Sequence, residues 1–167
     1  MFNHLILGTF SYGLLTYLVS LENNSKTFLI ILIDYICLLL IQSLGYYFAH
    51  IIMNTNKYYF IHKFHHQYSD IVIPMSANAV SSQEYLLAYM MPFIVGIIFL
   101  KPNRLALNLA ISTVSLANLI IHTPTLSKLS SKIIPKYFVK TSDHLEHHNR
   151  NKTKFSSPIL NLDYVII

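Results

Sequence analysis

Four long apolar stretches separated by short polar segments dominate the chain. They cover residues 5–21, 27–53, 84–100 and 105–121, and Pro92 could kink the third. A membrane-spanning helix needs about 17–25 mostly apolar residues, and each stretch is in or near that range. None alternates apolar with polar positions as a half-buried strand does. We therefore predict four transmembrane helices, because a helix satisfies its own backbone hydrogen bonds inside lipid.

The segments between these stretches divide the chain into two sides. Residues 22–26 and 101–104 are short polar turns, whereas 54–83 and 122–167 are longer. Four crossings place the two longer segments on the same side of the membrane. The prediction is a single all-α integral membrane domain, residues 1–167, whose histidine-rich cap comes from 54–83 and 122–167.

Composition agrees with a membrane protein. Hydrophobic residues make up 53% of the chain and charged residues only 11%, whereas a soluble domain carries about 25% charged residues. The first twenty residues lack a basic start and a small-residue cleavage site, so we predict a membrane helix there and not a cleaved signal peptide. The single cysteine, Cys37, excludes a disulfide framework and a thiolate zinc site.

The net charge of +5 indicates topology and not a nucleic-acid partner, because the basic residues form no compact block. Basic residues collect on the cytoplasmic side of membrane proteins. Three of the twelve lie at the short turns: Lys26, Lys101 and Arg104. The other nine lie on the cap side: Lys57, Lys63, Lys128, Lys132, Lys136, Lys140, Arg150, Lys152 and Lys154. We therefore predict a cytoplasmic cap on a multi-pass protein.

Two polar residues interrupt the second apolar stretch. Asp34 lies about a third of the way in from the far side, where an acidic group is costly unless it is functional or paired. It could also reach the interface or a bound water. Gln42 lies about 12 Å along the helix from His50. It could line a substrate channel, although a hydrogen bond between helices is favoured.

Histidine shows the clearest functional pattern. His62-Lys63-Phe64-His65-His66 and His144-Leu145-Glu146-His147-His148 both read His-x-x-His-His. Residues three and four apart share a helix face, so each triplet is expected to direct three imidazoles to one point. His50 and His122 end the second and fourth apolar stretches on the same side of the membrane.

These histidines exceed what one metal ion can bind, so we predict two ions. The predicted ligands are His50, His62, His65, His66, His122, His144, His147 and His148. Neutral imidazole suits zinc, copper, iron and nickel. A pair of irons at the mouth of an apolar bundle suits oxygen activation on a lipid substrate. No residue beyond the ligands is given a catalytic role.

The order of these motifs resembles the fatty acid hydroxylase and sterol desaturase superfamily of membrane di-metal oxygenases. The likeness covers roughly residues 40–167, and Glu84 falls where that family often has a glutamate. The matching pieces are Tyr47-Phe48-Ala49-His50, Ile61-His62-Lys63-Phe64-His65-His66, Ile121-His122, Asp143-His144-Leu145-Glu146-His147-His148, Phe155-Ser156-Ser157-Pro158 and Leu162-Asp163.

The resemblance implies a four-helix anchor with a cytoplasmic cap that holds two irons. Zinc could replace iron in purified protein. It also implies dioxygen as co-substrate and an electron donor of the cytochrome b5 type. Family members hydroxylate or desaturate fatty acyl chains, sterols and related lipids, and eukaryotic members reside in the endoplasmic reticulum.

The chain departs from the family in its first histidine motif, which is usually His-Arg-x-x-His. Here the arginine is Ile51 and the second histidine is Asn54. The Asn54 oxygen could bind a metal, or His4 could take the position. Otherwise one metal lacks a ligand, and the protein is slow, altered in its reaction or inactive. A lost ligand can cost 10–100-fold in metal affinity or activity.

Two other hypotheses remain open. A non-catalytic protein with the same fold would explain Asn54 and the missing arginine. A metal transporter would need histidines through the depth of the membrane, and here they lie at one face, so that hypothesis ranks last.

The segment 123–142 alternates lysines with apolar residues in places. It could lie on an anionic membrane surface or form a plain solvated face. Pro135 argues against one continuous helix there.

Overall fold

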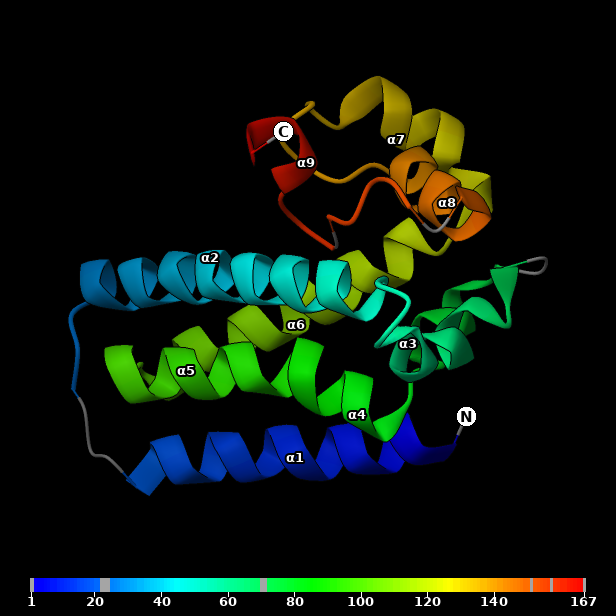
Figure 1. Ribbon diagram of the computed structural model, residues 1–167. Helices are drawn as coiled ribbons and strands as arrows, with labels where there is room; N and C mark the ends of the chain where they lie inside the picture. The colour runs from blue at the N-terminus through cyan, green and yellow to red at the C-terminus, as the bar shows by residue number, and fades with distance from the viewer. Residues whose placement is uncertain (1, 22–24, 70–71, 151, 157, 167) are drawn as a thin grey trace.

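The chain folds into a bundle of long helices with smaller helices gathered at one end (Figure 1). The computed structural model describes the backbone of residues 2–21, 25–69, 72–150, 152–156 and 158–166, and their side chains except for 2–7 and 21. Within these ranges it is all-α, apart from one isolated bridge between Phe138 and Leu160. The predicted all-α class is confirmed for this part of the chain.

Three helices are long and apolar enough to cross a membrane: Phe28–Met53, Ser82–Leu100 and Arg104–Ile121. The first is α2 and the last is α6. The middle one is continuous through α4 (Ser82–Glu84), the π-helix η3 (Tyr85–Met90) and α5 (Met91–Leu100). The first apolar stretch forms α1 (Phe2–Leu21). Its crossing of the membrane stays a prediction, because several of its side chains lie outside the described residues.

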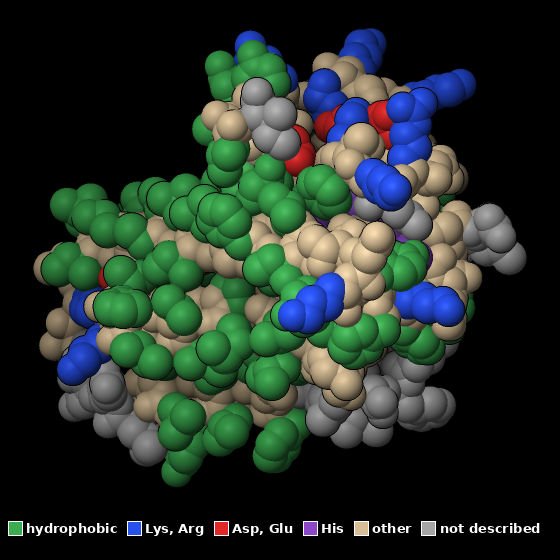
Figure 2. Space-filling model, viewed as in Figure 1, with side chains coloured by type: hydrophobic (Ala, Val, Ile, Leu, Met, Phe, Trp, Pro, Cys, Tyr) green, Lys and Arg blue, Asp and Glu red, His purple; other side chains and the backbone are tan. Residues whose placement is uncertain are grey.

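The outer faces of the bundle are apolar. Phe28 and Phe99 are 80% and 79% exposed, and many leucines and isoleucines are exposed beside them. Figure 2 shows hydrophobic side chains covering the long helices, whereas most lysines and arginines gather around the cap. So large an apolar surface is unfavourable in water and favourable in lipid.

The π-helix lies directly before Pro92 and relieves the break that this proline makes in the hydrogen-bond ladder. Pro92 has no N–H, so Ala88, four residues earlier, lacks its usual α-helical donor. Gln42 Nε2 on α2 donates to the Ala88 carbonyl at 3.3 Å. Gly45 allows α2 and α5 to lie this close together, because a Cβ on Gly45 would lie 2.6 Å from Pro92 Cγ. Gln42 therefore makes the favoured helix–helix bond.

Asp34 is paired at the end of the bundle far from the cap. Its Oδ2 accepts from Lys26 Nζ at 2.8 Å and from the Asn103 N–H at 3.1 Å. Lys26 Nζ also donates to the Leu100 carbonyl at 3.3 Å. The buried carboxylate therefore ties the start of α2 to the turn between α5 and α6.

The cap consists of short helices at the opposite end of the bundle. From 54–83 come α3 (Tyr59–His66) and the 3₁₀ helix η2 (Pro74–Asn78). The tail contributes η4 (Pro124–Leu126), α7 (Ser127–Ile133), α8 (Thr141–Arg150) and α9 (Leu162–Ile166). Helix α7 ends before Pro135, as expected. Asp163 accepts from the Phe155 and Ser156 N–H groups and thereby fixes the segment after α8.

We expect Asp34→Asn to lower the free energy of unfolding by about 1–3 kcal/mol, because Lys26 loses its charged partner in a largely buried site. Thermal unfolding in detergent would measure the change. Lys101→Gln, an exposed charge at the same end, is the control and should leave the melting temperature unchanged. Equal stability of both variants would show that the Asp34 pair does not hold this end together.

Candidate metal centre

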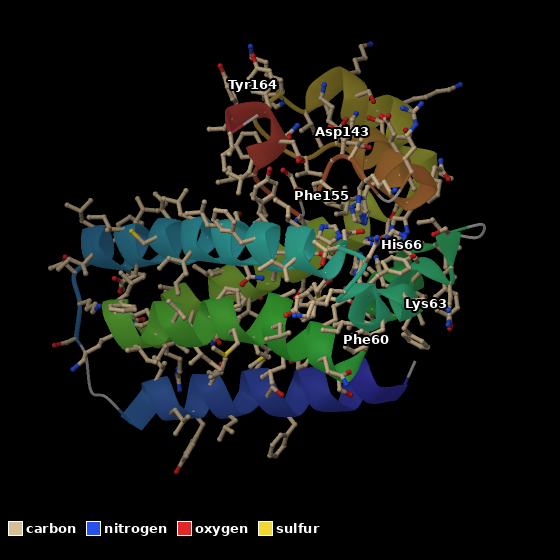
Figure 3. The ribbon with its side chains drawn as sticks, in the orientation of Figure 1. Phe60, Lys63, His66, Asp143, Phe155 and Tyr164 are labelled. Atoms are coloured by element: carbon tan, nitrogen blue, oxygen red, sulfur yellow. The ribbon has the colours of Figure 1, made fainter. Side chains whose placement is uncertain are left out.

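Eight buried histidines gather in the cap as two groups of four. In each group, one ligand nitrogen from every histidine lies within 4.8 Å of the others. Figure 3 shows the site where the end of α2 meets α3 and α8, with His66 inside it and Lys63 of the same helix pointing outward. The first group is His50, His62, His66 and His147, and the second is His65, His122, His144 and His148.

Each His-x-x-His-His triplet is divided between the two groups. The prediction that all three imidazoles of one triplet point to the same position was wrong. On an α-helix the residue at i+4 lies about 40° from residue i, and the residue at i+3 lies about 60° away on the other side. His62 and His66 therefore face the first group, while His65 faces the second. On α8 the i, i+4 pair faces the second group, and His147 faces the first.

Hydrogen bonds set the protonation of the rings. A backbone carbonyl only accepts, so a histidine Nδ1 bonded to one must carry the proton, which leaves the Nε2 lone pair for a metal. Four rings make such bonds: His50 to Phe155 at 2.7 Å, His147 to Thr153 at 2.8 Å, His122 to Asn118 at 2.8 Å and His65 to Ala79 at 3.3 Å.

The Nε2 atoms converge at separations that suit a shared ion. His50 and His62 Nε2 lie 2.9 Å apart. In the second group, the Nε2 of His122 lies 2.9 Å from that of His144 and 3.3 Å from that of His65. Two nitrogens each about 2.1 Å from one ion, at angles of roughly 90–110°, lie about 3.0–3.4 Å apart. The residues therefore fit the metal that the sequence implied.

Burial keeps these rings neutral. It lowers the pKa of His66 to about 3 and that of His122 to about 4, and neighbouring histidines add to the effect. The pKa values of His65 and His144 also lie well below the ordinary value, for the same reasons. Neutral imidazole is the form that binds a metal, so protons do not compete at neutral pH.

Glu84 is a positioning residue in the wall of the site. Its Oε1 lies 2.8 Å from His62 Nδ1, and both side chains are fully buried. Ser81 places it, because its Oγ caps α4 at the Glu84 N–H and donates to the Ile61 carbonyl on α3. Burial by itself favours the neutral form of the Glu84 carboxyl. A bound metal ion would favour the carboxylate form, which orients the ring of a ligand histidine and raises its basicity. Only the family likeness pointed to Glu84, and the backbone acceptors left no signal in the sequence.

Asn54 and His4 are the two further candidate ligands. Asn54 ends α2, and its Nδ2 donates to the His50 carbonyl at 2.8 Å. Its Oδ1 is buried without a hydrogen-bond partner in the described part of the chain. The first group contains four histidines without it. The side chain of His4 lies outside the described residues, so its role stays a prediction.

An apolar cavity of about 360 Å³ lies between the end of α2, α3 and η3. Two of its lining residues, Ala49 and Ile61, directly precede His50 and His62 of the first group. Its lining consists of Ala49, Ile52, Met53, Tyr58, Ile61 and Leu87.

We expect Glu84→Gln to weaken metal binding at the first group by about 10–100-fold, since His62 loses its carboxylate partner. Titration of the metal-free protein with ferrous iron would measure the change. Gln83→Ala, at the exposed neighbouring position, serves as the control. Unaltered affinity in Glu84→Gln would mean that the carboxylate does not position a ligand.

The chain was also compared with known proteins. The family model described as fatty acid hydroxylase matches residues 35–166, which include the eight histidines and Glu84. No curated protein and no solved structure matches significantly. The match covers most of the chain and agrees with the buried histidine groups at the mouth of an apolar bundle. The chain therefore belongs to the fatty acid hydroxylase family.

Proposed function

We propose that the protein is a membrane-bound di-iron oxidoreductase that hydroxylates or desaturates a lipid chain with dioxygen. The observation that carries the proposal is the pair of buried four-histidine groups at the end of a bundle with apolar outer faces. Membership of the fatty acid hydroxylase family supports the same chemistry.

The chain itself supplies the ligands, their orientation and a dry site. His50, His62, His66 and His147 would hold one iron, and the other four histidines would hold the second. Irons bound there would supply the power to oxidise an unactivated C–H bond with dioxygen. All eight rings are buried, which would keep bulk water away from ions bound there. Zinc could occupy the same nitrogens in purified protein.

The apolar cavity beside the first group is the proposed site of the substrate chain. Its volume of about 360 Å³ is within the usual range for a ligand pocket. Ile52, Tyr58 and Leu87 are partly exposed, so the cavity opens toward the lipid-facing surface. Lys57 Nζ lies 5.1 Å from the centre of the Tyr58 ring. This cation at the rim favours a lipid with an acidic headgroup.

The overall chemistry needs no general base from the chain. Hydroxylation consumes one dioxygen, two electrons and two protons, and it yields an alcohol and water. In desaturation, a second hydrogen would be removed from the neighbouring carbon in place of hydroxyl transfer, and the same dioxygen, electrons and protons would give a double bond and two waters. The electrons would come from a cytochrome b5-type donor that docks on the cytoplasmic cap. For a eukaryotic chain the membrane would be the endoplasmic reticulum.

The alternative is a member of the same fold that has lost activity. It rests on Asn54 and on Ile51, which stands where the family has arginine. Four histidines already surround the first position, so the altered motif does not by itself empty it. This observation favours an active enzyme.

Metal analysis of the detergent-purified protein tests the proposal directly. We expect two irons per chain, one in either His147→Ala or His144→Ala, and none in the double variant. Asn54→His should leave the count at two, because the first group has four ligands without it. Gln67→Ala, at the exposed end of α3, is the control.

Wild-type protein without iron, or without lipid-dependent oxygen consumption when an electron donor is added, would contradict the proposal. Iron that rises only in Asn54→His would instead support the inactive alternative.

We also expect Ala49→Phe to fill the substrate cavity and to exclude long acyl chains while leaving iron content unchanged. Product analysis of cells that express the variant would detect the loss. Leu44→Phe, on the lipid-facing side of the same helix, is the control and should act like wild type. Unchanged products with Ala49→Phe would place the substrate elsewhere.

A further inference from the structure

A second apolar cavity, of about 330 Å³, lies between α6 and the cap and has no part in the proposed reaction. We call it the cap groove. One wall is the C-terminal half of α6, and the other is the segment after α7 together with residues 158 and 159. The lining residues are Thr113, Ala117, Ile120, Ile121, Ile133, Ile134, Pro135, Phe138, Val139, Pro158 and Ile159.

The α6 wall of the groove follows the axis of a helix that could span a membrane. Its wall on α6 runs from Thr113 to Ile121, about 12 Å along a helix that is long and apolar enough to span the bilayer. A chain lying in the groove would therefore run along the helix as lipid tails do. The one hydroxyl in the lining, on Thr113, is already bonded to the Tyr35 hydroxyl at 3.1 Å.

Lysines flank the part of the groove that the cap contributes. Residues 123–142 contain four lysines and no acidic residue. Lys132 and Lys136 are exposed and directly adjoin the lining residues Ile133 and Pro135. Lys136 Nζ lies 4.6 Å from the centre of the Tyr164 ring and donates to its hydroxyl. Ammonium groups beside an apolar groove complement an acidic headgroup above a lipid tail.

The surrounding surface also suits contact with a membrane. Figure 1 shows α7 and α9 standing out beside α2, and Figure 3 shows Tyr164 at the outer edge of this part of the cap. Ile133 and Val165 are 63% and 64% exposed there. Exposed apolar side chains and tyrosines beside lysines are typical of the membrane–water interface.

We propose that the cap groove binds one acyl chain of an anionic phospholipid from the surrounding leaflet, with its phosphate at Lys132 and Lys136. The bound lipid holds the cap against the membrane surface. This site requires that α6 spans the membrane, but it requires neither the metal ions nor the oxidation of a substrate.

The test uses the full chain in nanodiscs made of phosphatidylcholine with a fraction of phosphatidylglycerol. Native mass spectrometry after detergent release would count the retained phospholipids. We expect wild type to retain one phosphatidylglycerol. Ala117→Phe, which fills the groove, should lower the amount of phosphatidylglycerol retained per chain by about tenfold or more. Leu116→Phe, at a 60% exposed position on the same helix, is the matched control and should retain it.

A variant with fewer charges tests the headgroup site without altering the side chains that line the groove. Lys132→Gln combined with Lys136→Gln should abolish the preference for phosphatidylglycerol over phosphatidylcholine. Lys63→Gln, on the opposite side of the cap, should keep it.

Retention of the lipid by Ala117→Phe, or wild type without a headgroup preference, would overturn the proposal. So would an Ala117→Phe variant that keeps its phospholipid but excludes the oxidised lipid, because the groove would then be a substrate site. Iron content, measured on the same samples, reports separately on the histidine groups.

Discussion

The candidate metal centre depends on nitrogen lone pairs that the fold brings together in a buried site. Nε2 atoms 2.9–3.3 Å apart repel one another unless a cation lies between them, and a ring can offer Nε2 only if Nδ1 holds the proton. A carbonyl or carboxylate oxygen lies within hydrogen-bond distance of Nδ1 in five of the eight rings. These acceptors come from distant segments, including the carbonyls of Phe155 and Thr153 and the carboxylate of Glu84. The segment after α8 thus shapes the site through its backbone, and Asp163 holds that segment in place.

The two ends of the bundle solve different electrostatic problems. At the far end, a single buried carboxylate is compensated by Lys26 and by a backbone N–H, so its cost is met locally. At the cap end, the rings stay neutral because burial opposes their protonation, and the missing positive charge is left for a metal. The same low-polarity surroundings therefore favour an ion pair at one end and an uncharged ligand set at the other.

The bundle also leaves two apolar cavities where its helices meet the cap. The first adjoins the histidine group that includes His50 and opens near Lys57, and the second runs down α6 and ends at the lysines of the cap. Both combine an apolar wall from a spanning helix with a basic rim. The second cavity exists because the cap extends over the side of the bundle as well as its end. A reacting lipid in the first cavity and a fixed lipid in the second would therefore occupy separate sites.

Apolar length and histidine spacing predicted four spanning helices, the all-α class, the eight candidate ligands and the family, and three of the four helices are long and apolar enough to cross a membrane. These features could be predicted because each depends on neighbours along one helix or on a short motif. Tertiary structure alone decided that His147 joins His50 while His144 joins His122, that Glu84 supports His62, and that Asp34 binds Lys26. A helical period tells which residues share a face. It does not tell how far one helix is rotated about its axis relative to another. A rotation of roughly 50°, half of the turn that one residue makes, determines which of the two histidine groups an imidazole joins.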